Sequence, residues 1–240
     1  MLLRRVTLCA VLWWALAPGQ AEALPFGTTA GRVVLGEGVY ADRVPAPCVY
    51  STVYTPGCFS WVPEGFALPP PSMGTRVNML AATARGRIVA ALEGGGMAFT
   101  DDRGTTWHRA RMDGMMPSPR TLAFDDRSDF GAAVGVGGTL WTTDDGGARW
   151  RVRRDGGLGG DLVDVAVVGH TVALTDAVGG VWVSTNGGGS VRTLATRARD
   201  AMPVLGVHGG AVWIRMEGGR WWRAGRDGSV ERQERGPWGG

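Results

Sequence analysis

The sequence predicts an all-β protein built from repeated four-stranded units. A turn motif recurs at intervals of 41 to 43 residues, glycine bounds short alternating or apolar runs, and no stretch of ten or more residues has a convincing helical period. Glycine supplies 40 of the 240 residues, about 17% against a usual ~7%, so the chain is expected to be rich in turns.

The composition supports a folded core and argues against nucleic acid as a partner. Hydrophobic residues make up 44% of the chain and charged residues 20%, which is enough apolar surface for a core. All 25 basic side chains are arginine, and the 22 acids leave a net charge of only +3. Such a balance lacks the basic stripe that nucleic-acid binding requires.

Residues 1–23 have the three parts of a secretory signal peptide. Arg4 and Arg5 precede the apolar run Val6 to Ala17, and Ala21-Glu22-Ala23 provides a small-x-small cleavage site. The apolar run is too short for a membrane span, which needs ~20 residues. We therefore expect an exported protein, periplasmic or extracellular, with no transmembrane segment in the mature chain.

Residues 24–74 are expected to form an irregular first unit, because several prolines restrict strand pairing there. This unit contains Cys48 and Cys58, the two cysteines of the mature chain. An even pair in an exported protein predicts a disulfide, and two unpaired buried thiols are the alternative.

The repeated turn motif, T-x-D-x-G-x-x-W, appears in two strong copies and two weaker ones within residues 75–236. Its aspartates or asparagine lie 43, 41 and 41 positions apart, at Asp102, Asp145, Asn186 and Asp227. An Asp or Asn side chain accepts hydrogen bonds from its own turn, glycine supplies positive φ, and a closing Trp packs between neighbouring units. The residues expected to have these structural roles are Asp102, Gly104, Trp107, Asp145, Gly147, Trp150, Asn186, Gly188 and Asp227.

Four strand-length runs fall in each of four successive units. The predicted strands are 77–83, 87–92, 97–100 and 106–111; 120–124, 131–136, 139–143 and 149–153; 162–168, 171–175, 181–184 and 191–195; and 204–207, 211–216, 220–223 and 229–233. Repeated four-stranded antiparallel units are typical of a β-propeller, here with about five blades, closed or nearly closed. Trp141 and Trp182 align in the third strands, where packing between blades is expected. Trp221 and Trp222 must face opposite ways in a strand, so one of them is a candidate partner contact if exposed.

The repeated turns resemble the Asp-box, or bacterial neuraminidase repeat. The unit from Leu122 to Trp150 resembles the repeat of photosystem II stability/assembly factor-like proteins. The resemblance implies an Asp-box propeller with its box turns between the third and fourth strands of each blade. Such propellers include sialidases, other glycosidases, sorting receptors and noncatalytic assembly factors, so the fold leaves the function open.

The residue inventory favours binding over catalysis. Sialidases are implied to use a late tyrosine, whereas the three tyrosines here are Tyr40, Tyr50 and Tyr54. We expect no catalytic residue, metal site or cofactor, and a monomer that binds a protein or glycan partner in the cell envelope. A small glycoside hydrolase of the sialidase-like superfamily is the alternative, because a glycosidase needs only two suitably spaced carboxylates.

A partner is expected to bind the side of the propeller opposite the box turns. The box turn joins strands three and four, so the turn between strands two and three lies at the other end of the blade. Acids recur in these opposite turns at Glu93, Asp176 and Glu217, which are predicted to surround one mouth of the channel. The connections between units are predicted to bring arginines to the same side, namely Arg120, Arg153, Arg154, Arg197 and Arg199.

Overall fold

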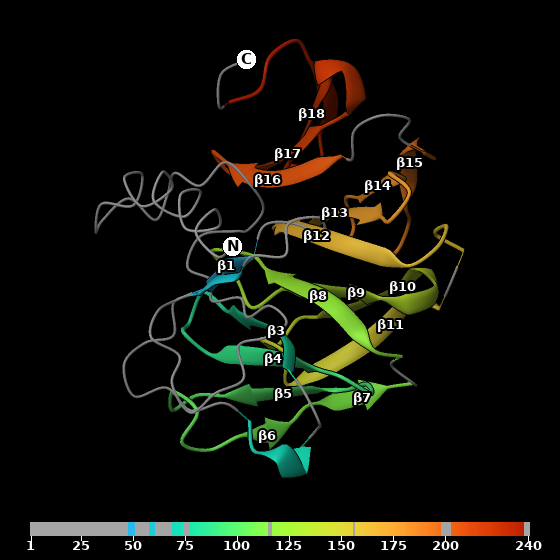
Figure 1. Ribbon diagram of the computed structural model, residues 1–240. Helices are drawn as coiled ribbons and strands as arrows, with labels where there is room; N and C mark the ends of the chain where they lie inside the picture. The colour runs from blue at the N-terminus through green and yellow to red at the C-terminus, as the bar shows by residue number, and fades with distance from the viewer. Residues whose placement is uncertain are drawn as a thin grey trace, which may run out of the picture.

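The computed structural model describes residues 48–50, 58–60, 69–73, 77–114, 117–155, 157–197 and 203–237. The predicted signal peptide and most of the predicted first unit lie outside these residues. The described part contains four large, mainly antiparallel sheets placed one after another, from the β3–β6 sheet to the β16–β19 sheet, and a separate two-stranded pair (Figure 1).

The first two sheets pair consecutive strands. The first contains β3 (Val77–Ala82), β4 (Ile88–Leu92), β5 (Met97–Thr100) and β6 (His108–Arg109). The second contains β8 (Pro119–Phe124), β9 (Gly131–Gly135), β10 (Thr139–Thr143) and β11 (Arg149–Asp155), with β7 (Arg111–Asp113) added at its outer edge.

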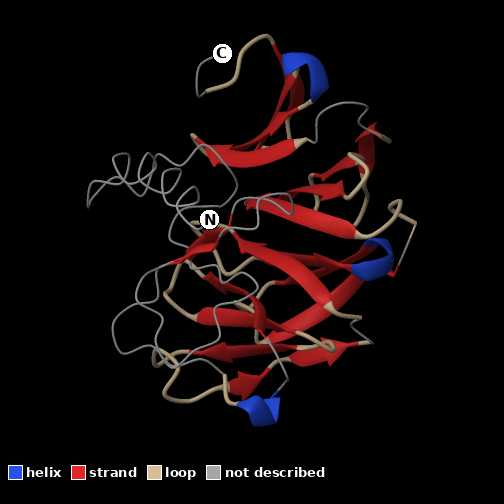
Figure 2. Cartoon of the chain, viewed as in Figure 1, coloured by secondary structure: helices blue, strands red, loops and turns tan. Residues whose placement is uncertain are grey.

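The other two sheets have the same plan. The third contains β12 (Leu162–Val168), β13 (Thr171–Asp176), β14 (Val181–Ser184) and β15 (Arg192–Ala195). The fourth contains β16 (Val204–His208), β17 (Ala211–Arg215), β18 (Trp221–Gly225) and β19 (Val230–Gln233). The described residues also form three short 3₁₀ turns, η2 (Pro71–Met73), η3 (Val136–Gly138) and η4 (Glu217–Gly219) (Figure 2).

The predicted strand 106–111 is wrong, because the chain changes sheets within it. The Ala110 N–H donates to Met97 O at 2.9 Å in the first sheet, whereas the Arg111 N–H donates to Ala148 O at 2.8 Å in the second. The strand therefore divides into β6 and β7, and β7 pairs in parallel with β11. A sequence pattern records apolar periodicity and cannot show which sheet a backbone joins.

The core lies between the sheets. Trp141 and Trp150 pack with apolar residues of the first sheet, and Trp182 packs with apolar residues of the second. Trp141 is 1% exposed and Trp150 is fully buried, so the predicted packing between blades is confirmed. Trp221 is buried as well, and Trp222 packs between the third and fourth sheets, so neither is the exposed contact considered from the sequence.

The short strands β1 (Cys48–Tyr50) and β2 (Cys58–Ser60) form a separate antiparallel pair. Their register places Tyr50 opposite Cys58 and Cys48 opposite Ser60. The cysteine side chains lie outside the described part, so the predicted disulfide stays a prediction.

The topology is that of a β-propeller, with its described blades arranged one after another. The innermost strands of successive blades, β3, β8, β12 and β16, lie next to one another. The first and last sheets occupy opposite ends of the row (Figure 1). Closure of a ring by a fifth unit stays a prediction, because most of residues 24–74 lie outside the described part.

Candidate binding face

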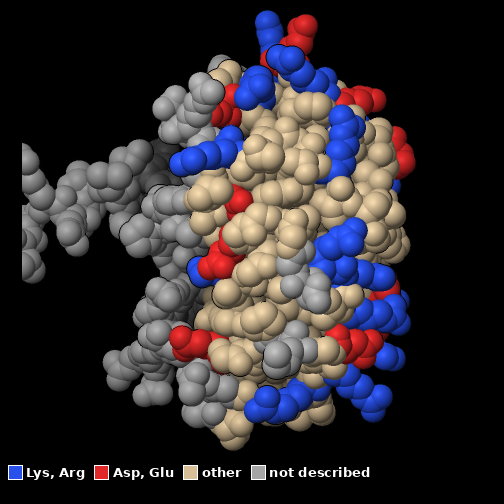
Figure 3. All heavy atoms as spheres, turned by 90° about the vertical axis from the view of Figure 1, so that its right-hand side faces the viewer, with Lys and Arg blue, Asp and Glu red and all other residues tan. Residues whose placement is uncertain are grey.

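The two ends of the blades form two distinct faces. We call the end with the turns between third and fourth strands the box face; those turns are residues 101–107, 144–148, 185–191 and 226–229. We call the other end the connection face; it has the turns 93–96, 136–138, 177–180 and 217–220 and the inter-sheet segment 157–161. Figure 3 looks onto the connection face, where basic side chains gather along one edge and acids are scattered.

In the box turns, backbone N–H and hydroxyl groups donate hydrogen bonds to the acidic side chain of the same turn. Thr100 Oγ1 donates to Asp102 Oδ1 at 2.8 Å and accepts from the Gly104 N–H at 2.9 Å, while the Thr106 N–H donates to the same Asp102 oxygen at 2.8 Å. These bonds, first of all the one from Thr106, hold the pKa of Asp102 below its usual value. The same three bonds recur in two further turns, formed by Thr143, Asp145, Gly147 and Arg149, and by Ser184, Asn186, Gly188 and Ser190.

The fourth box turn is tighter. The Gly225 N–H donates to Ser229 O at 2.8 Å, and Ser229 donates to Asp227 through both its N–H and its hydroxyl. The carboxylate of Asp227 therefore accepts from a residue two positions further along the chain, whereas Asp102 accepts from a residue four positions further along. In the first three box turns and in this one, the recurring acid or amide is used to hold a turn.

Glu93 and Glu217 lie in the connection-face turns where the sequence predicts them. Glu93 is exposed and Glu217 is partly exposed. Each lies at the opposite end of its sheet's third strand from the box turn.

Asp176 is a correction to the predicted set of partner contacts. It is only 1% exposed, and its Oδ1 accepts the N–H groups of Val178 at 3.0 Å and Gly180 at 2.7 Å. The carboxylate therefore holds the β13–β14 turn and offers no surface to a partner. Its position at the end of a strand resembled that of the two glutamates, but its shorter side chain turns back onto its own backbone.

Arg120 lies on the connection face and links its own sheet, the second, to the segment that begins the third sheet. Its Nη2 is 2.6 Å from Asp161 Oδ2, and Asp161 Oδ1 accepts the Gly137 N–H at 2.9 Å. Both side chains keep substantial solvent exposure, 45% for Arg120 and 36% for Asp161. Sequence reasoning missed Asp161, although an acid directly before the apolar run of β12 is a visible signal.

Arg153 and Arg154 are a second correction. Arg153 Nε donates to Thr142 Oγ1 at 2.8 Å, and Arg154 Nη2 donates to Gly189 O at 3.0 Å, within the third sheet's box turn. Their backbone lies near the connection face, but these long side chains extend toward the box face. Arg197 is exposed in the segment that follows β15, and Arg199 lies outside the described residues.

Three innermost strands have bulges near the connection face, and two of these bulges carry polar residues. The register shifts at Asn78 in β3, at Arg120 in β8 and at Val163 in β12. Asn78 Nδ2 donates to Pro119 O at 2.9 Å, at the start of β8. Arg120 bonds Asp161, directly before β12, so each of these two bulge residues contacts the beginning of the next blade. A bulge re-aims a side chain, which here provides a contact between blades.

Asp164 follows the third bulge and has an unusual acidity. Burial of its carboxyl group raises its pKa to about 7, and the hydrogen bond donated by the N–H of the next residue, Val165, only partly offsets this rise. The residue retains part of its surface accessible to solvent. It is a proton-carrying group near neutral pH that the sequence did not single out.

An ion network on the box face joins three blades. Arg226 Nη2 lies 2.7 Å from Asp125 and 2.6 Å from Asp126, and Asp125 Oδ1 also accepts the Gly169 N–H at 2.8 Å. Burial raises the pKa of Asp125, but hydrogen bonds from Arg226, Gly169 and Ser128 outweigh it, so the pKa lies well below its usual value. Its partners lie 44 and 101 positions away, so sequence reasoning missed this network.

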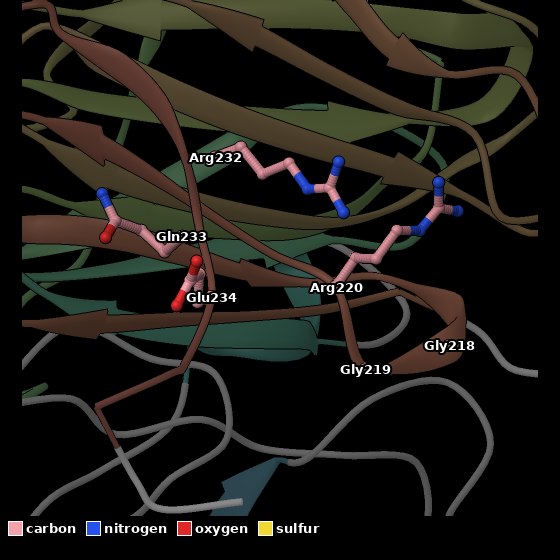
Figure 4. Close-up of a pocket in the computed structure, with 6 residues that line it drawn as sticks. All are labelled: Gly218, Gly219, Arg220, Arg232, Gln233 and Glu234. Carbon is pink, nitrogen blue, oxygen red and sulfur yellow. The ribbon is translucent and has the colours of Figure 1, made fainter.

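A groove of about 610 Å³ lies beside η4 on the connection face. Its lining residues are Gly218, Gly219, Arg220, Arg232, Gln233 and Glu234. Figure 4 shows the side chains of Arg220 and Arg232 extending to the same side of the last sheet.

In the described part of the chain, no group of three or more His, Cys, Asp and Glu is placed to hold a metal ion. No helix in the same residues has the length and apolar character needed to cross a membrane.

The fold and its two faces define a β-propeller. No protein-family model and no curated protein matches the chain. Among solved structures, it is similar to YCF48 from Cyanidioschyzon merolae, with 14% identity, a TM-score of 0.40, and coverage of 61% of this chain and 53% of that one. It is also similar to the GH74 xyloglucanase from Xanthomonas campestris, with 22% identity, a TM-score of 0.46, and coverage of 70% and 26%.

A further structure, described as YCF48 bound to D1 peptide, has 16% identity and a TM-score of 0.43, with coverage of 62% of this chain and 60% of that one. The chain thus spans about half the length of the first YCF48 chain and about a quarter of the xyloglucanase. These similarities concern the fold.

Proposed function

We propose that the protein is an exported, noncatalytic β-propeller of the Asp-box, assembly-factor-like kind, and that its connection face binds a macromolecular partner in the cell envelope. The observation that carries this proposal is the division of charged groups between the two faces. Charged groups are exposed on both faces, but the recurring box acids Asp102 and Asp145 fix the conformation of their own turns. On the connection face, Glu93, Glu217 and the Arg120–Asp161 pair are accessible to solvent and hold no box turn. Polar groups held on rigid turns suit recognition of a complementary surface.

Capture of the partner from a native envelope extract tests the proposal. The variant Glu93→Gln/Glu217→Gln neutralises two acids of the connection face, and we expect it to capture less partner than the wild type. Asp101 and Asp144 lie in the box turns and pair with Arg87 and Arg151. Asp101→Asn/Asp144→Asn removes the same charge from the box face and serves as the charge-matched control. Equal capture by the two double variants at equal melting temperature would contradict the assignment to the connection face.

Export is tested separately. Residues 1–23 fused to alkaline phosphatase should give activity, because this enzyme needs disulfides that form outside the cytosol. A fusion in which Leu8 and Leu12 are both replaced by Arg should be inactive, because charges interrupt the apolar run. Activity without the 1–23 segment would remove this support for export.

A small glycoside hydrolase is the second candidate, and Asp164 is the observation that favours it. A carboxyl group with a pKa of about 7 remains partly protonated at neutral pH, as a general acid requires. A panel of chromogenic glycosides, sialosides included, separates the two functions. Turnover that persists through purification and is lost in Asp164→Asn would favour the hydrolase over the binding protein.

A further inference from the structure

The 3₁₀ turns η3 and η4 have the same backbone conformation in two different blades. The central glycine has φ 71° and ψ 21° at Gly137, and φ 73° and ψ 19° at Gly218. A side chain closes each turn onto its first carbonyl: Thr139 Oγ1 donates to Val136 O at 2.8 Å, and Arg220 Nε donates to Glu217 O at 3.2 Å. The two turns therefore present equivalent backbone groups.

The η3 turn holds a carboxylate. The Gly137 N–H donates to Asp161 Oδ1 at 2.9 Å, and Arg120 bonds the other carboxylate oxygen at 2.6 Å. The segment that carries Asp161 lies close over the turn, since a Cβ at Gly138 would be 3.2 Å from Leu158 N and 3.4 Å from Gly160 O. One backbone N–H and one guanidinium thus bind one carboxylate here.

The η4 turn has the same backbone conformation without the covering segment, and its arginines come from other positions. Arg220 directly follows the turn, as Thr139 follows η3, and Arg232 lies on β19. A Cβ at Gly218 or Gly219 would meet nothing within 4 Å, and no carboxylate of the described residues bonds the Gly218 N–H. Arg220 and Arg232 line the groove beside it and, in the described part, pair with no acid (Figure 4). The chain that follows β19 passes the edge of the groove at Glu234 and packs on the ring of Trp221 at Gly236.

We propose that the η4 groove binds a carboxylate of the partner, held by the Gly218 N–H and the guanidinium groups of Arg220 and Arg232. Such bonds are charge-assisted, and arginine fits the planar geometry of a carboxylate. This inference rests on the proposed function and names the chemistry that the partner presents. An acidic side chain and a chain terminus offer the same group, so the test separates them.

The probe is the segment that occupies η3, residues 157–162, as the blocked peptide acetyl-GLGGDL-amide, whose one carboxylate is that of the Asp. In ¹H–¹⁵N spectra of the full chain, it should shift the Gly218 and Gly219 amide signals saturably, with a dissociation constant on the order of 1 mM. The Asn peptide acetyl-GLGGNL-amide should bind roughly tenfold more weakly, because it lacks the charge. Acetyl-GLGGNL with a free C-terminus tests the terminal carboxylate.

Arg220→Gln/Arg232→Gln should weaken binding of the Asp peptide by roughly tenfold. The control Arg215→Gln/Arg235→Gln has the same net charge and should bind as the wild type does. Equal binding of the Asp and Asn peptides, no saturable shift up to ~10 mM peptide, or unchanged binding by the Arg220/Arg232 variant would overturn the inference. Partner capture from an extract is a separate readout: if capture persists while the peptide fails to bind, this inference fails and the proposed function stands.

Discussion

Asp125 and Asp164 lie near opposite ends of neighbouring innermost strands, and their carboxyl groups titrate in opposite directions. Both are shielded from solvent to some degree, which by itself raises the pKa of an acid. Among the described residues, Asp125 accepts bonds from a guanidinium, a hydroxyl and a backbone N–H, whereas Asp164 accepts one from a backbone N–H alone. Hydrogen-bond donors, and not burial alone, decide which form is stable.

Asp125 should make folding sensitive to acid. Its pKa is lower in the folded chain than in the unfolded chain, so its contribution is present above the ordinary pKa near 4 and is lost as pH falls below it. We expect Asp125→Asn to reduce the free energy of unfolding by about 2–3 kcal/mol at pH 7, because Arg226 loses a buried partner. Urea denaturation at pH 7 and pH 3 measures this, and a variant that retains the full acid sensitivity of the wild type would contradict it.

Asp164 should have the opposite effect. Its folded pKa of about 7 exceeds the unfolded value, so folding loses stability as pH rises from about 4 to about 7. At pH 8, Asp164→Asn should therefore have a free energy of unfolding about 2 kcal/mol higher than the wild type in urea denaturation. This gain is below the ~4 kcal/mol that a fully buried carboxyl group would give. At pH 4 the two proteins should match, and a stability gain independent of pH would show that the carboxyl group is not the cause.

At the scale of elements, the box turn is the unit that repeats. In three turns one hydroxyl and one Asp or Asn oxygen satisfy the same backbone N–H groups. The second of these turns also packs on the preceding sheet, where a Cβ at Gly147 would come within 2.7 Å of Val89. Gly147 has φ 86°, so both backbone conformation and space require glycine there.

The box turns should differ in their contribution to stability. Asp145→Ala removes the acceptor of the Arg149 N–H and Thr143 hydroxyl bonds, and we expect a loss of about 1–2 kcal/mol. Asp227→Ala acts on the tighter, exposed fourth turn and should cost less than Asp145→Ala. Asp145→Asn retains the acceptor oxygen, as Asn186 does naturally, and should resemble the wild type in urea denaturation. Equal losses for Asp145→Ala and Asp145→Asn would mean that charge, not turn geometry, matters.

At the scale of the whole molecule, the first sheet has a buried face that points away from the second sheet. Leu80, Ala90 and Ala98 on this face are fully buried. The described residues that cluster with them come from the same sheet and from Met73. We therefore expect residues 24–74 to supply the cover, as the predicted first unit of the ring.

Removal of residues 1–74 should expose this apolar face and abolish the cooperative thermal transition. Burial of these side chains stabilises the fold by about 25 cal/mol per Å² of apolar surface. In the described part of the chain, the remaining blades have no other contact that would compensate for this loss. Removal of residues 1–23 alone should leave the transition intact and is the control. A cooperative melt of the 75–240 fragment would instead indicate a stable open array of four blades.

The sequence by itself determined the repeat, the four-stranded plan and most strand positions, because turn chemistry and apolar runs are local. Strands such as Thr139–Thr143 and Leu162–Val168 match their predicted bounds. The tertiary structure alone decided the transfer of β7 to the next sheet, the pairing of Asp125 with Arg226, the inward turn of Asp176 and the direction of Arg153 and Arg154. Each of these depends on a hydrogen-bond partner or a side-chain direction in three dimensions, and residue identity and spacing specify neither.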